Sequence, residues 1–575
     1  MNLYRLGRGR DGSEVSYRLC NFTARIAEEI IEDDGDTLTQ KYVITNQMKN
    51  CNLPAIEVPA DKFNNLNWVS QWGVRAVIEP GQSTRDYIRH GIQVLSSNVQ
   101  RSHYFVHCGW RKVEDEMVFL TGTGAVGGKN VKVRHSKEME RYSLPAVPEN
   151  EAEAIKTSFS FLDIAKSDIT FPLFSFLYLS PLTTILDPMP NFSGYIYGES
   201  GTFKTTLASL LLCHFGDFLA VQGLSGFDDT LRSLEKRGFT LKDSLMLLDD
   251  YHPSHDRKSS QGKENIAQGL IRAFANRTAR HRLKSDATER GAYSPRGMLM
   301  ITAEELIIMQ STLARTMVIE IEQGDIDRER LTELQGKAHQ LPHAMTSFLL
   351  WLKPQLKDIQ SKFREQFIQL RERAFKEGDH RRLPEMVAFL QYGLDLALSW
   401  AMDKGALTET EAARLSEKGW AVFTATAKHQ AQCVEGEDPV TRFAEVFTTL
   451  LDQGKVRLDG LRPGEFMGWD KSQNLGFFDA DFLYILPAAL WNVIQKFCIA
   501  EGEHFPFRKH TLYKMLKNRG LLEVGKEGYS ANNLWLKGAT RKVIKITRTG
   551  PFQDLKVKQE EEKSFSSLYG KGSDE

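Results

Sequence analysis

The fold is decided by the stretch Gly194-Tyr-Ile-Tyr-Gly-Glu-Ser-Gly-Thr-Phe-Lys-Thr-Thr206. It begins with an apolar, β-prone run, turns through glycines, and opens onto a helical run from Leu207 to Leu212. Glycines let backbone N–H groups converge on phosphate oxygens, and the N-terminus of a helix adds the positive end of its dipole. This order of strand, glycine-rich turn and helix predicts a phosphate-binding loop in an α/β fold.

The side chains that follow the turn suit a nucleoside triphosphate. A lysine at position 204 can reach the β- and γ-phosphates, and the hydroxyl of Thr205 can bind Mg²⁺. The usual pattern is G-x-x-x-x-G-K-[ST], and Phe203 stands where its last glycine belongs. A chance turn is the alternative, but the strand–helix context favours a site for ATP and Mg²⁺. The residues expected to contact the nucleotide are Gly198, Glu199, Ser200, Gly201, Thr202, Phe203, Lys204, Thr205 and Thr206.

Length and composition indicate a multidomain globular protein. A chain of 575 residues is long enough for about three or four domains. Lys+Arg and Asp+Glu both number 74, so any nucleic-acid binding must come from local basic patches. The six cysteines include no C-x-x-C pair, which argues against a zinc ribbon or a disulfide framework and favours a reducing cytoplasm.

No segment of the sequence predicts a membrane protein. The N-terminus lacks the apolar core of a signal peptide. The most apolar segment, 169–186, contains Pro172 and Pro181 and is expected to be a buried element. We therefore expect a cytoplasmic protein that has no membrane partner.

Residues 1–147 predict a β-rich N-terminal domain. Short apolar runs alternate there with Gly, Asn and Asp turns. Gly122–Gly127 matches G-x-G-x-x-G, but the alternation that follows indicates a glycine hairpin instead of a dinucleotide site. The acidic cluster Glu32–Asp36 is interpreted as a solvated turn, because it lacks the ligand spacing of a metal loop.

Residues 148–330 predict the core around the phosphate loop. The apolar run before Asp249 predicts a buried parallel strand that brings this carboxylate beside the phosphates to hold Mg²⁺. Asp250 follows at the position where a carboxylate orients or deprotonates the attacking water. Many ATPases have Glu there, so Asp250 is a departure with a shorter reach. A later buried strand ends in Thr302, where a polar residue senses the γ-phosphate, and Arg315 is placed like an arginine finger.

The clearest basic stretch of the chain covers residues 271–296. Charge runs are usually solvated surface, and that interpretation stays open here. The alternative is a nucleic-acid contact made by Arg277, Arg280, Arg282 and Lys284.

The remaining chain divides into three parts. Residues 331–435 are predicted to be helical and to form a lid, in which Arg382, with Arg381 as the other candidate, reaches back over the nucleotide. Residues 436–558 contain a basic amphipathic helix ended by Gly520 and followed by basic strands, as in a winged helix. The tail, 559–575, is charged and rich in Ser, and is expected to be disordered.

Several of these stretches resemble a known family. The loop Gly198–Thr205 resembles the variant loop of minichromosome maintenance (MCM) helicases, where a residue other than Gly also precedes the Lys. Residues from about 55 to 545 resemble an MCM-like family of AAA+ ATPases from phages and other mobile genetic elements, which includes the cassette chromosome helicases of staphylococcal resistance elements. The matching stretches are Asn67–Gly73, Gly109–Lys112, the loop, Leu248–Asp250, the basic stretch, and His380–Ala388.

The resemblance implies an AAA+ P-loop NTPase core between the β-rich domain and the winged helix. It implies a hydrolase and helicase that forms a hexameric ring, translocates on single-stranded or forked DNA, and works with a primase or another replication partner of a mobile element. It also implies a DNA-contacting hairpin before the Thr302 strand. Two alternatives stay open: an AAA+ switch or remodeller of phage defence or element regulation that does not unwind DNA, and a DNA-binding adaptor with a degenerate nucleotide pocket.

Overall fold

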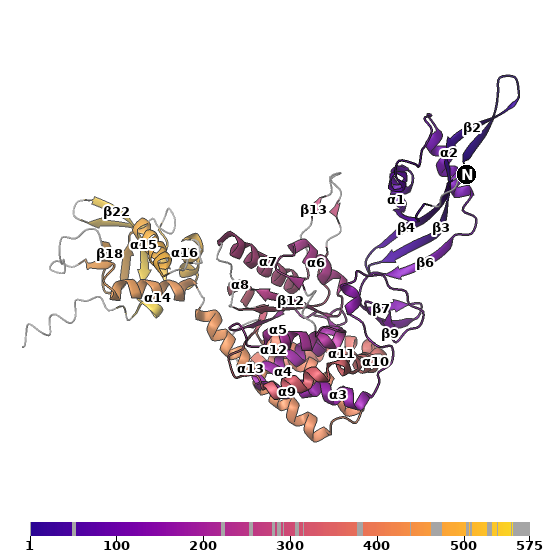
Figure 1. Cartoon of the computed structure of the whole chain (residues 1–575). Coiled ribbons are helices and arrows are strands. Elements are labelled where there is room, and N and C mark those ends of the chain that lie inside the picture. The colour runs from indigo at the N-terminus through magenta and orange to yellow at the C-terminus, as the bar shows by residue number, and fades with distance from the viewer. Residues whose placement is uncertain are drawn as a thin grey trace, which may run out of the picture. The chain divides into compact units, whose positions relative to one another are not determined.

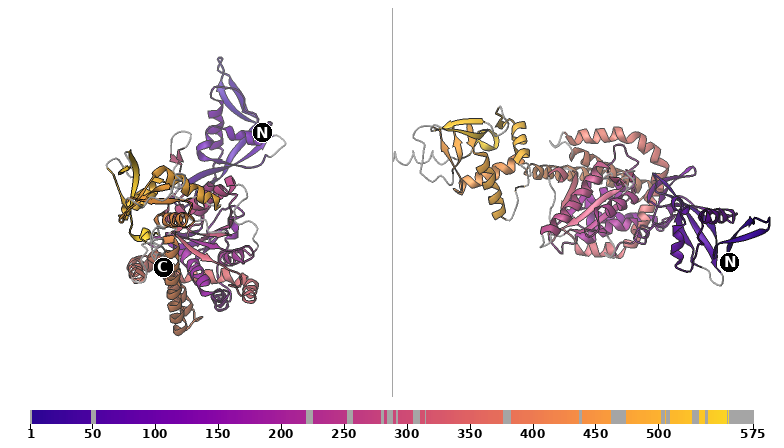
Figure 2. Two further views of the ribbon diagram at one scale, coloured as in Figure 1. Left: turned by 90° about the vertical axis from the view of Figure 1, so that its left-hand side faces the viewer. Right: turned by 90° about the horizontal axis from the view of Figure 1, so that it is seen from above.

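The computed structural model describes two compact units, Met1–His429 and Gln430–Glu575 (Figures 1 and 2). Each unit has its own hydrophobic core. The described residues are 2–48, 53–219, 225–251, 257–278, 282–283, 289–290, 293–304, 310–313, 315–375, 383–436, 439–461, 474–501, 505, 509–525, 532–536, 539–553 and 555.

The first unit begins with β-structure, as the sequence predicts. Strands β1 (Leu3–Arg8) and β2 (Glu14–Cys20) form a hairpin. A four-stranded sheet follows in the order β5-β4-β3-β6. Helix α2 (Thr84–Val94) buries Ile88 and Ile92 in the same core as the edge-to-face pair Phe22 and Trp72. The bounds of the sheet strands are Phe22–Asp33 (β3), Leu38–Met48 (β4), Ile56–Pro59 (β5) and Gln100–Phe105 (β6).

A small three-stranded sheet packs against the core of the first unit. Its strands are β7 (Gly109–Val113), β8 (Glu116–Leu120) and β9 (Ala125–Val126), and β8 pairs with β9 through the glycine-rich turn. A hairpin is therefore present, but its second strand lies inside the motif, and the alternating residues after Gly127 form only an isolated bridge at Val133. The backbone N–H of Trp110 donates to the buried carboxylate of Asp243 at 3.1 Å, which ties this sheet to the core.

The acidic cluster differs from its prediction as a solvated turn. Asp33 is 2% exposed, and its Oδ2 accepts a 2.7 Å hydrogen bond from Arg111. The guanidinium of Arg296 donates to the backbone oxygen of Asp34 at 2.7 Å and to Oδ1 of Asp36 at 3.1 Å. The interpretation as solvated charges is wrong for Asp33, which is buried beside Arg111, whereas the side chain of Asp36 is 59% exposed in the turn between β3 and β4.

A five-stranded parallel sheet in the order β11-β12-β15-β10-β16 forms the centre of the first unit. Helices α6 and α7 lie on one side of it, and α4 and α5 lie on the other (Figure 1). Residues 218 and 219 lie in a loop between α5 and β11. The bounds are Ser193–Tyr197 (β10), Ser225–Gly226 (β11), Leu245–Tyr251 (β12), Met298–Ala303 (β15), Thr316–Glu320 (β16), Ser167–Leu179 (α4), Lys204–Leu212 (α5), Leu231–Thr240 (α6) and Arg257–Asn276 (α7).

Helices follow the sheet, as the sequence predicts. Thr408 and Glu411 form a capping box at the start of α13, in which the N–H of Thr408 donates to Glu411 at 2.9 Å and the N–H of Glu411 donates to Thr408 at 3.3 Å. Within the described part of the chain, no helix combines the length and the apolar character that crossing a membrane requires. The bounds are Arg328–Gly336 (α9), Leu341–Leu352 (α10), Leu356–Phe375 (α11), Leu383–Asp403 (α12) and Glu409–Gly436 (α13).

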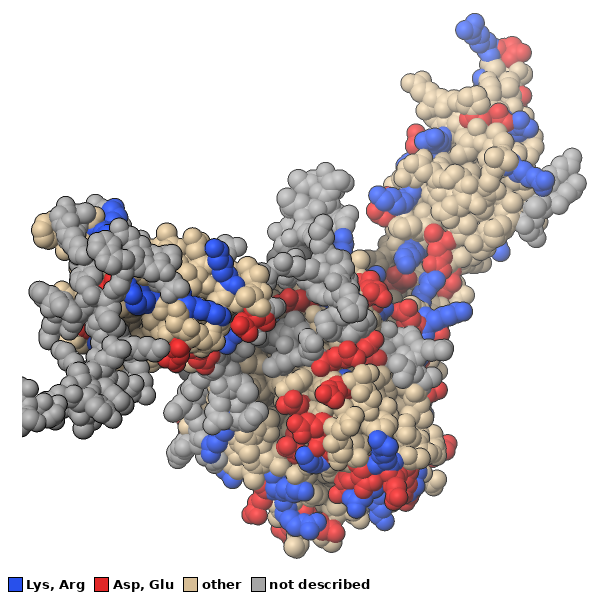
Figure 3. All heavy atoms as spheres, turned by 60° about the vertical axis from the view of Figure 1, so that its left-hand side comes forward, with Lys and Arg blue, Asp and Glu red and all other residues tan. Residues whose placement is uncertain are grey.

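The surface carries charges of both signs. Figure 3 shows acidic and basic side chains interspersed on the visible face of the first unit. This distribution agrees with the formal net charge of zero.

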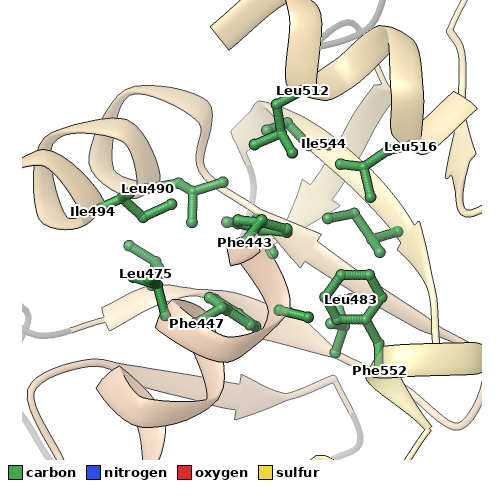
Figure 4. Packing of buried hydrophobic residues seen from close by; sticks show 14 of the residues in the cluster. Phe443, Phe447, Leu475, Leu483, Leu490, Ile494, Leu512, Leu516, Ile544 and Phe552 are labelled. Carbon is green, nitrogen blue, oxygen red and sulfur yellow. The ribbon is translucent and has the colours of Figure 1, made fainter. Parts of the chain in front are cut away.

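The second unit packs three helices against a mostly antiparallel sheet. Strands run in the order β17-β18-β19-β22-β20, and β21 pairs with β22. Phe443 and Phe447 of α14 (Pro439–Asp452) pack in its core with Leu483 and Phe552 (Figure 4). The remaining bounds are Arg457–Gly460 (β17), Asn474–Phe478 (β18), Phe482–Ile485 (β19), Pro487–Ala500 (α15), Lys509–Asn518 (α16), Leu522–Glu523 (β20), Asn532–Leu536 (β21) and Ala539–Thr547 (β22).

Candidate nucleotide site

The loop between β10 and α5 has the backbone of a phosphate-binding turn. Gly198 has a φ of +156°, and a Cβ there would lie 2.1 Å from the backbone oxygen of Ile321, so the position requires glycine. Phe203 has a φ of +64°, the left-handed region that glycine enters at no steric cost. The residue that replaces the last glycine therefore keeps the conformation of a glycine, and α5 begins directly after it.

Lys204 is buried in the loop. Its Nζ donates to the backbone oxygen of Glu199 at 2.7 Å and contacts Oγ1 of Thr202 at 3.4 Å. Burial lowers the pKa of Lys204, and the negative charges of Glu304, Asp250 and Asp249, in that order, oppose the shift. An ammonium group in this position can exchange its contact with a carbonyl oxygen for one with a phosphate oxygen.

Strand β12 brings the two predicted carboxylates to the loop. Oδ1 of Asp249, a buried side chain, accepts a 3.0 Å hydrogen bond from the hydroxyl of Thr205. The hydroxyl of Thr302 also donates to Oδ1 of Asp249, and it accepts a 3.0 Å bond from the backbone N–H of Asp250. The residues proposed for Mg²⁺ thus place a hydroxyl and a carboxylate in contact, and such oxygen ligands fit this cation.

Lys204, Thr205, Asp250 and Thr302 line one polar cavity of about 270 Å³. The cavity adjoins the N-terminus of α5, which directs the positive end of a helix dipole at any bound anion. Glu304 also lines the cavity and was not predicted, because it belongs to no motif in the sequence. The lining consists of Ser200, Gly201, Phe203, Lys204, Thr205, Thr206, Asp250, Thr302, Ala303 and Glu304.

Arg315 lies away from this cavity. Its backbone oxygen accepts a 3.0 Å bond from the N–H of Ser193, at the beginning of β10. The phosphate loop leaves the opposite end of β10, and β16 of five residues spans about 16 Å. Arg315 therefore lies at the N-terminal ends of the parallel strands, whereas the phosphate loop of the same chain lies at their C-terminal ends. Arg381 and Arg382 lie outside the described residues.

The structure describes the side chain of Arg277 within the basic stretch. Arg277, one of the four residues expected to contact DNA, directs its guanidinium inward and donates to the backbone oxygens of Gly297, at 2.6 Å, and Pro190. Burial lowers the pKa of Arg277 to about 10. Because these carbonyl groups hold its guanidinium, the expectation that Arg277 contacts DNA is corrected to a structural role.

An antiparallel pair of strands lies where a hairpin was expected. Strand β13 (Arg282–Leu283) pairs with β14 (Glu289–Arg290), and Arg282 lies opposite Arg290 (Figure 1). Arg280 and Lys284 lie outside the described residues, as do the side chains of both strands.

The fold is similar to that of a solved helicase. A structure described as "SCCmec type IV Cch - active helicase" matches with a TM-score of 0.57 and covers 93% of this chain and 94% of that chain. The two sequences are 12% identical, so the similarity concerns the fold. No family model matches the sequence, and no curated protein matches it. The chain therefore has a helicase-like α/β fold.

Proposed function

We propose that the protein is an ATP-dependent DNA helicase or translocase. The observation that carries the proposal is the contact between Thr205 and Asp249 beside the buried Lys204. Residues that are distant in sequence meet there at one end of a parallel sheet, and Thr205 and Lys204 line a cavity of about 270 Å³. The helicase-like fold supports DNA as the molecule that is moved.

The reaction we propose is hydrolysis of ATP to ADP and phosphate. The backbone of the loop and Lys204 bind the phosphates, and Thr205 and Asp249 hold Mg²⁺. Bound Mg²⁺ supplies neutralisation of charge on the phosphate oxygens. Thr302 senses the γ-phosphate through its links to Asp249 and Asp250, and a carboxylate on the cavity wall orients the attacking water. The sequence pattern predicts that Asp250 is the carboxylate that orients this water.

Coupling to DNA requires a ring of subunits in this proposal. Arg315 reaches the γ-phosphate of a neighbouring subunit, since it lies far from its own loop. We infer a homo-oligomer, in the form of a hexamer, whose hairpin residues Arg280, Arg282 and Lys284 contact the phosphates of single-stranded or forked DNA. One of the lid arginines, Arg381 or Arg382, contacts the nucleotide.

The wider setting is also part of the proposal. We divide the chain into the N-terminal domain (1–147), an AAA+ core (148–330), the lid (331–435) and a winged-helix region (436–558), followed by a tail. In the last region, α15 and α16 precede the β21–β22 ribbon, which is the order of helices and wing in a winged helix. We propose a cytoplasmic protein that replicates a phage or another mobile element with an MCM-like mechanism and contacts a primase or another replication partner.

The test is phosphate release with and without single-stranded DNA, for the wild type and Lys204→Ala. We expect that the wild type hydrolyses ATP and that DNA stimulates this hydrolysis. Lys204→Ala should lose nearly all ATPase activity, because the substitution removes the ammonium group that contacts the transferred phosphate. A wild-type protein without ATPase activity would refute the proposal and leave the adaptor function. Hydrolysis without strand separation would favour the switch or remodeller.

A further inference from the structure

Glu304 stands at the end of the strand that carries Thr302. Strand β15 ends at Ala303, so Glu304 follows it directly, and both Thr302 and Glu304 line the cavity. The N–H of Glu304 donates to the backbone oxygen of Tyr251 at 2.9 Å. This hydrogen bond joins the ends of β15 and β12 beside the cavity that Glu304 lines.

Asp249 and Thr302, the polar side chains beside Glu304 at this end of the sheet, are already engaged in hydrogen bonds. Oδ1 of Asp249 accepts hydrogen bonds from Thr205 and Thr302, and the hydroxyl of Thr302 is engaged both as donor and as acceptor. Asp249 is in addition the proposed ligand of Mg²⁺. A carboxylate that holds a cation in this way is poorly suited to accept a proton at the same time.

Among the described residues that line the cavity, Asp250 and Glu304 carry the carboxylates that can act on the attacking water. Asp250 has a φ of +63° and lies in a register shift of β12, so the strand turns at this residue. It is exposed, whereas Glu304 is partly buried and has one more methylene of reach. Among the carboxylates, Glu304 has the largest electrostatic effect on Lys204, followed by Asp250 and Asp249.

We propose that Glu304 is the catalytic base of the proposed ATPase, on which this inference rests. The oxygen of water forms a bond to the γ-phosphorus while the bond from that phosphorus to the β–γ bridging oxygen breaks. The bridging oxygen keeps the electron pair and leaves with ADP. One proton of the water passes to the carboxylate of Glu304, and the other stays on the phosphate that is released.

The test compares Glu304→Gln with Asp250→Asn in the full-length protein at saturating single-stranded DNA. Each substitution keeps the size of the side chain and removes its capacity to accept a proton. For Glu304→Gln we expect kcat to fall by about 100-fold or more, as for loss of a general base, with the affinity for a fluorescent ATP analogue unchanged. Glu333→Gln, on the exposed face of α9, is the control and should keep wild-type kcat.

The pH profile separates a base from a merely structural group. Wild-type kcat/KM should fall on the acid side as the base takes up a proton, and Glu304→Gln should lack this acid limb. Glu304→Asp, which retains the carboxylate, should recover part of kcat.

Three results would overturn the inference. They are Glu304→Gln with more than about a third of wild-type kcat, an acid limb that disappears in Asp250→Asn and persists in Glu304→Gln, and loss of ATP binding together with hydrolysis in Glu304→Gln. In each case the wild type still hydrolyses ATP, so the proposed function would stand. A wild type that hydrolyses no ATP would overturn both.

Discussion

The hydroxyl of Thr205 donates a 3.0 Å hydrogen bond to Oδ1 of Asp249. Thr205 is in α5, directly after β10 and the phosphate loop, and Asp249 is in β12, which β15 separates from β10, so the contact depends on the strand order β12-β15-β10. Thr302, on the strand between them, donates to the same oxygen. Three elements thus place a hydroxyl and a carboxylate where Mg²⁺ is proposed to bind.

Thr205→Val should raise the Mg²⁺ concentration needed for half-maximal hydrolysis by about tenfold, the equivalent of about 1.4 kcal/mol. Valine has nearly the shape of threonine and lacks the oxygen ligand. Thr205→Ser keeps the hydroxyl and should stay near wild type. The measurement is ATPase rate against Mg²⁺ concentration. Equal Mg²⁺ dependence of Thr205→Val and the wild type would exclude this hydroxyl as a ligand.

Arg315 should act across a subunit boundary. Arg315→Ala, with an intact phosphate loop, and Lys204→Ala, with an intact arginine, should each be inactive alone. Mixing them creates some interfaces that pair a working loop with a working arginine, so part of the ATPase activity should return. Such an arginine contributes about 10³-fold or more in rate, whereas a surface ion pair contributes about 1 kcal/mol or less.

Two results would contradict the trans assignment of Arg315. The first is a mixture of the two variants that regains no ATPase activity under conditions where subunits exchange. The second is full ATPase activity of Arg315→Ala alone, which would show that Arg315 has no part in hydrolysis.

The hairpin should provide phosphate contacts with DNA. Arg280→Ala combined with Arg282→Ala should weaken single-strand binding and lower the slope of log affinity against log salt by about 0.7 for each lost contact. Basal ATPase activity without DNA should persist. Arg277→Met is the comparison, because its guanidinium binds backbone oxygens, and it should lower stability while it leaves the slope unchanged. If the double variant binds DNA with wild-type affinity and salt dependence, the hairpin does not contact DNA and its charges are solvated surface charges.

Stability should fall as the pH drops below about 6.5, the ordinary pKa of histidine. Burial lowers the pKa of His107 to about 3 and that of His214 to about 4 in the folded protein. Between the folded and unfolded pKa values the unfolded chain binds more protons, so each histidine removes about 1.4 kcal/mol of stability per pH unit.

The check is urea unfolding of the wild type and His214→Gln from about pH 7 to about pH 5, with the exposed His90→Gln as control. The wild type and the control should share one slope, and His214→Gln should have a shallower one by about 1.4 kcal/mol per pH unit. Identical slopes in all three proteins would contradict the assignment to His214.

The parts of the fold that were predictable depend on local pattern. The stretch around Gly198 and the apolar run before Asp249 specify their strands within a few residues, and the structure has β10 and β12 there. Local pattern carries no information on pairing between distant charges. For this reason the burial of Asp33 by Arg111 and the inward direction of Arg277 were not predicted.

The candidate site was predictable in outline for the same reason. Lys204, Thr205 and Asp249 occupy positions that a motif defines, and the structure brings them together. Glu304 belongs to no motif in the sequence, and only the alignment of β15 beside β12 places it at the cavity. The positive φ of Phe203 likewise became visible only in the structure.

Strand displacement on forked DNA tests the central claim most directly. The wild type is compared with Lys204→Ala at equal protein concentration, with ATP and with an analogue that cannot be hydrolysed. The account predicts that only the wild type with ATP separates the strands, at a rate that follows its ATPase activity. Robust ATP hydrolysis with no strand separation, or separation by Lys204→Ala at the wild-type rate, would contradict it.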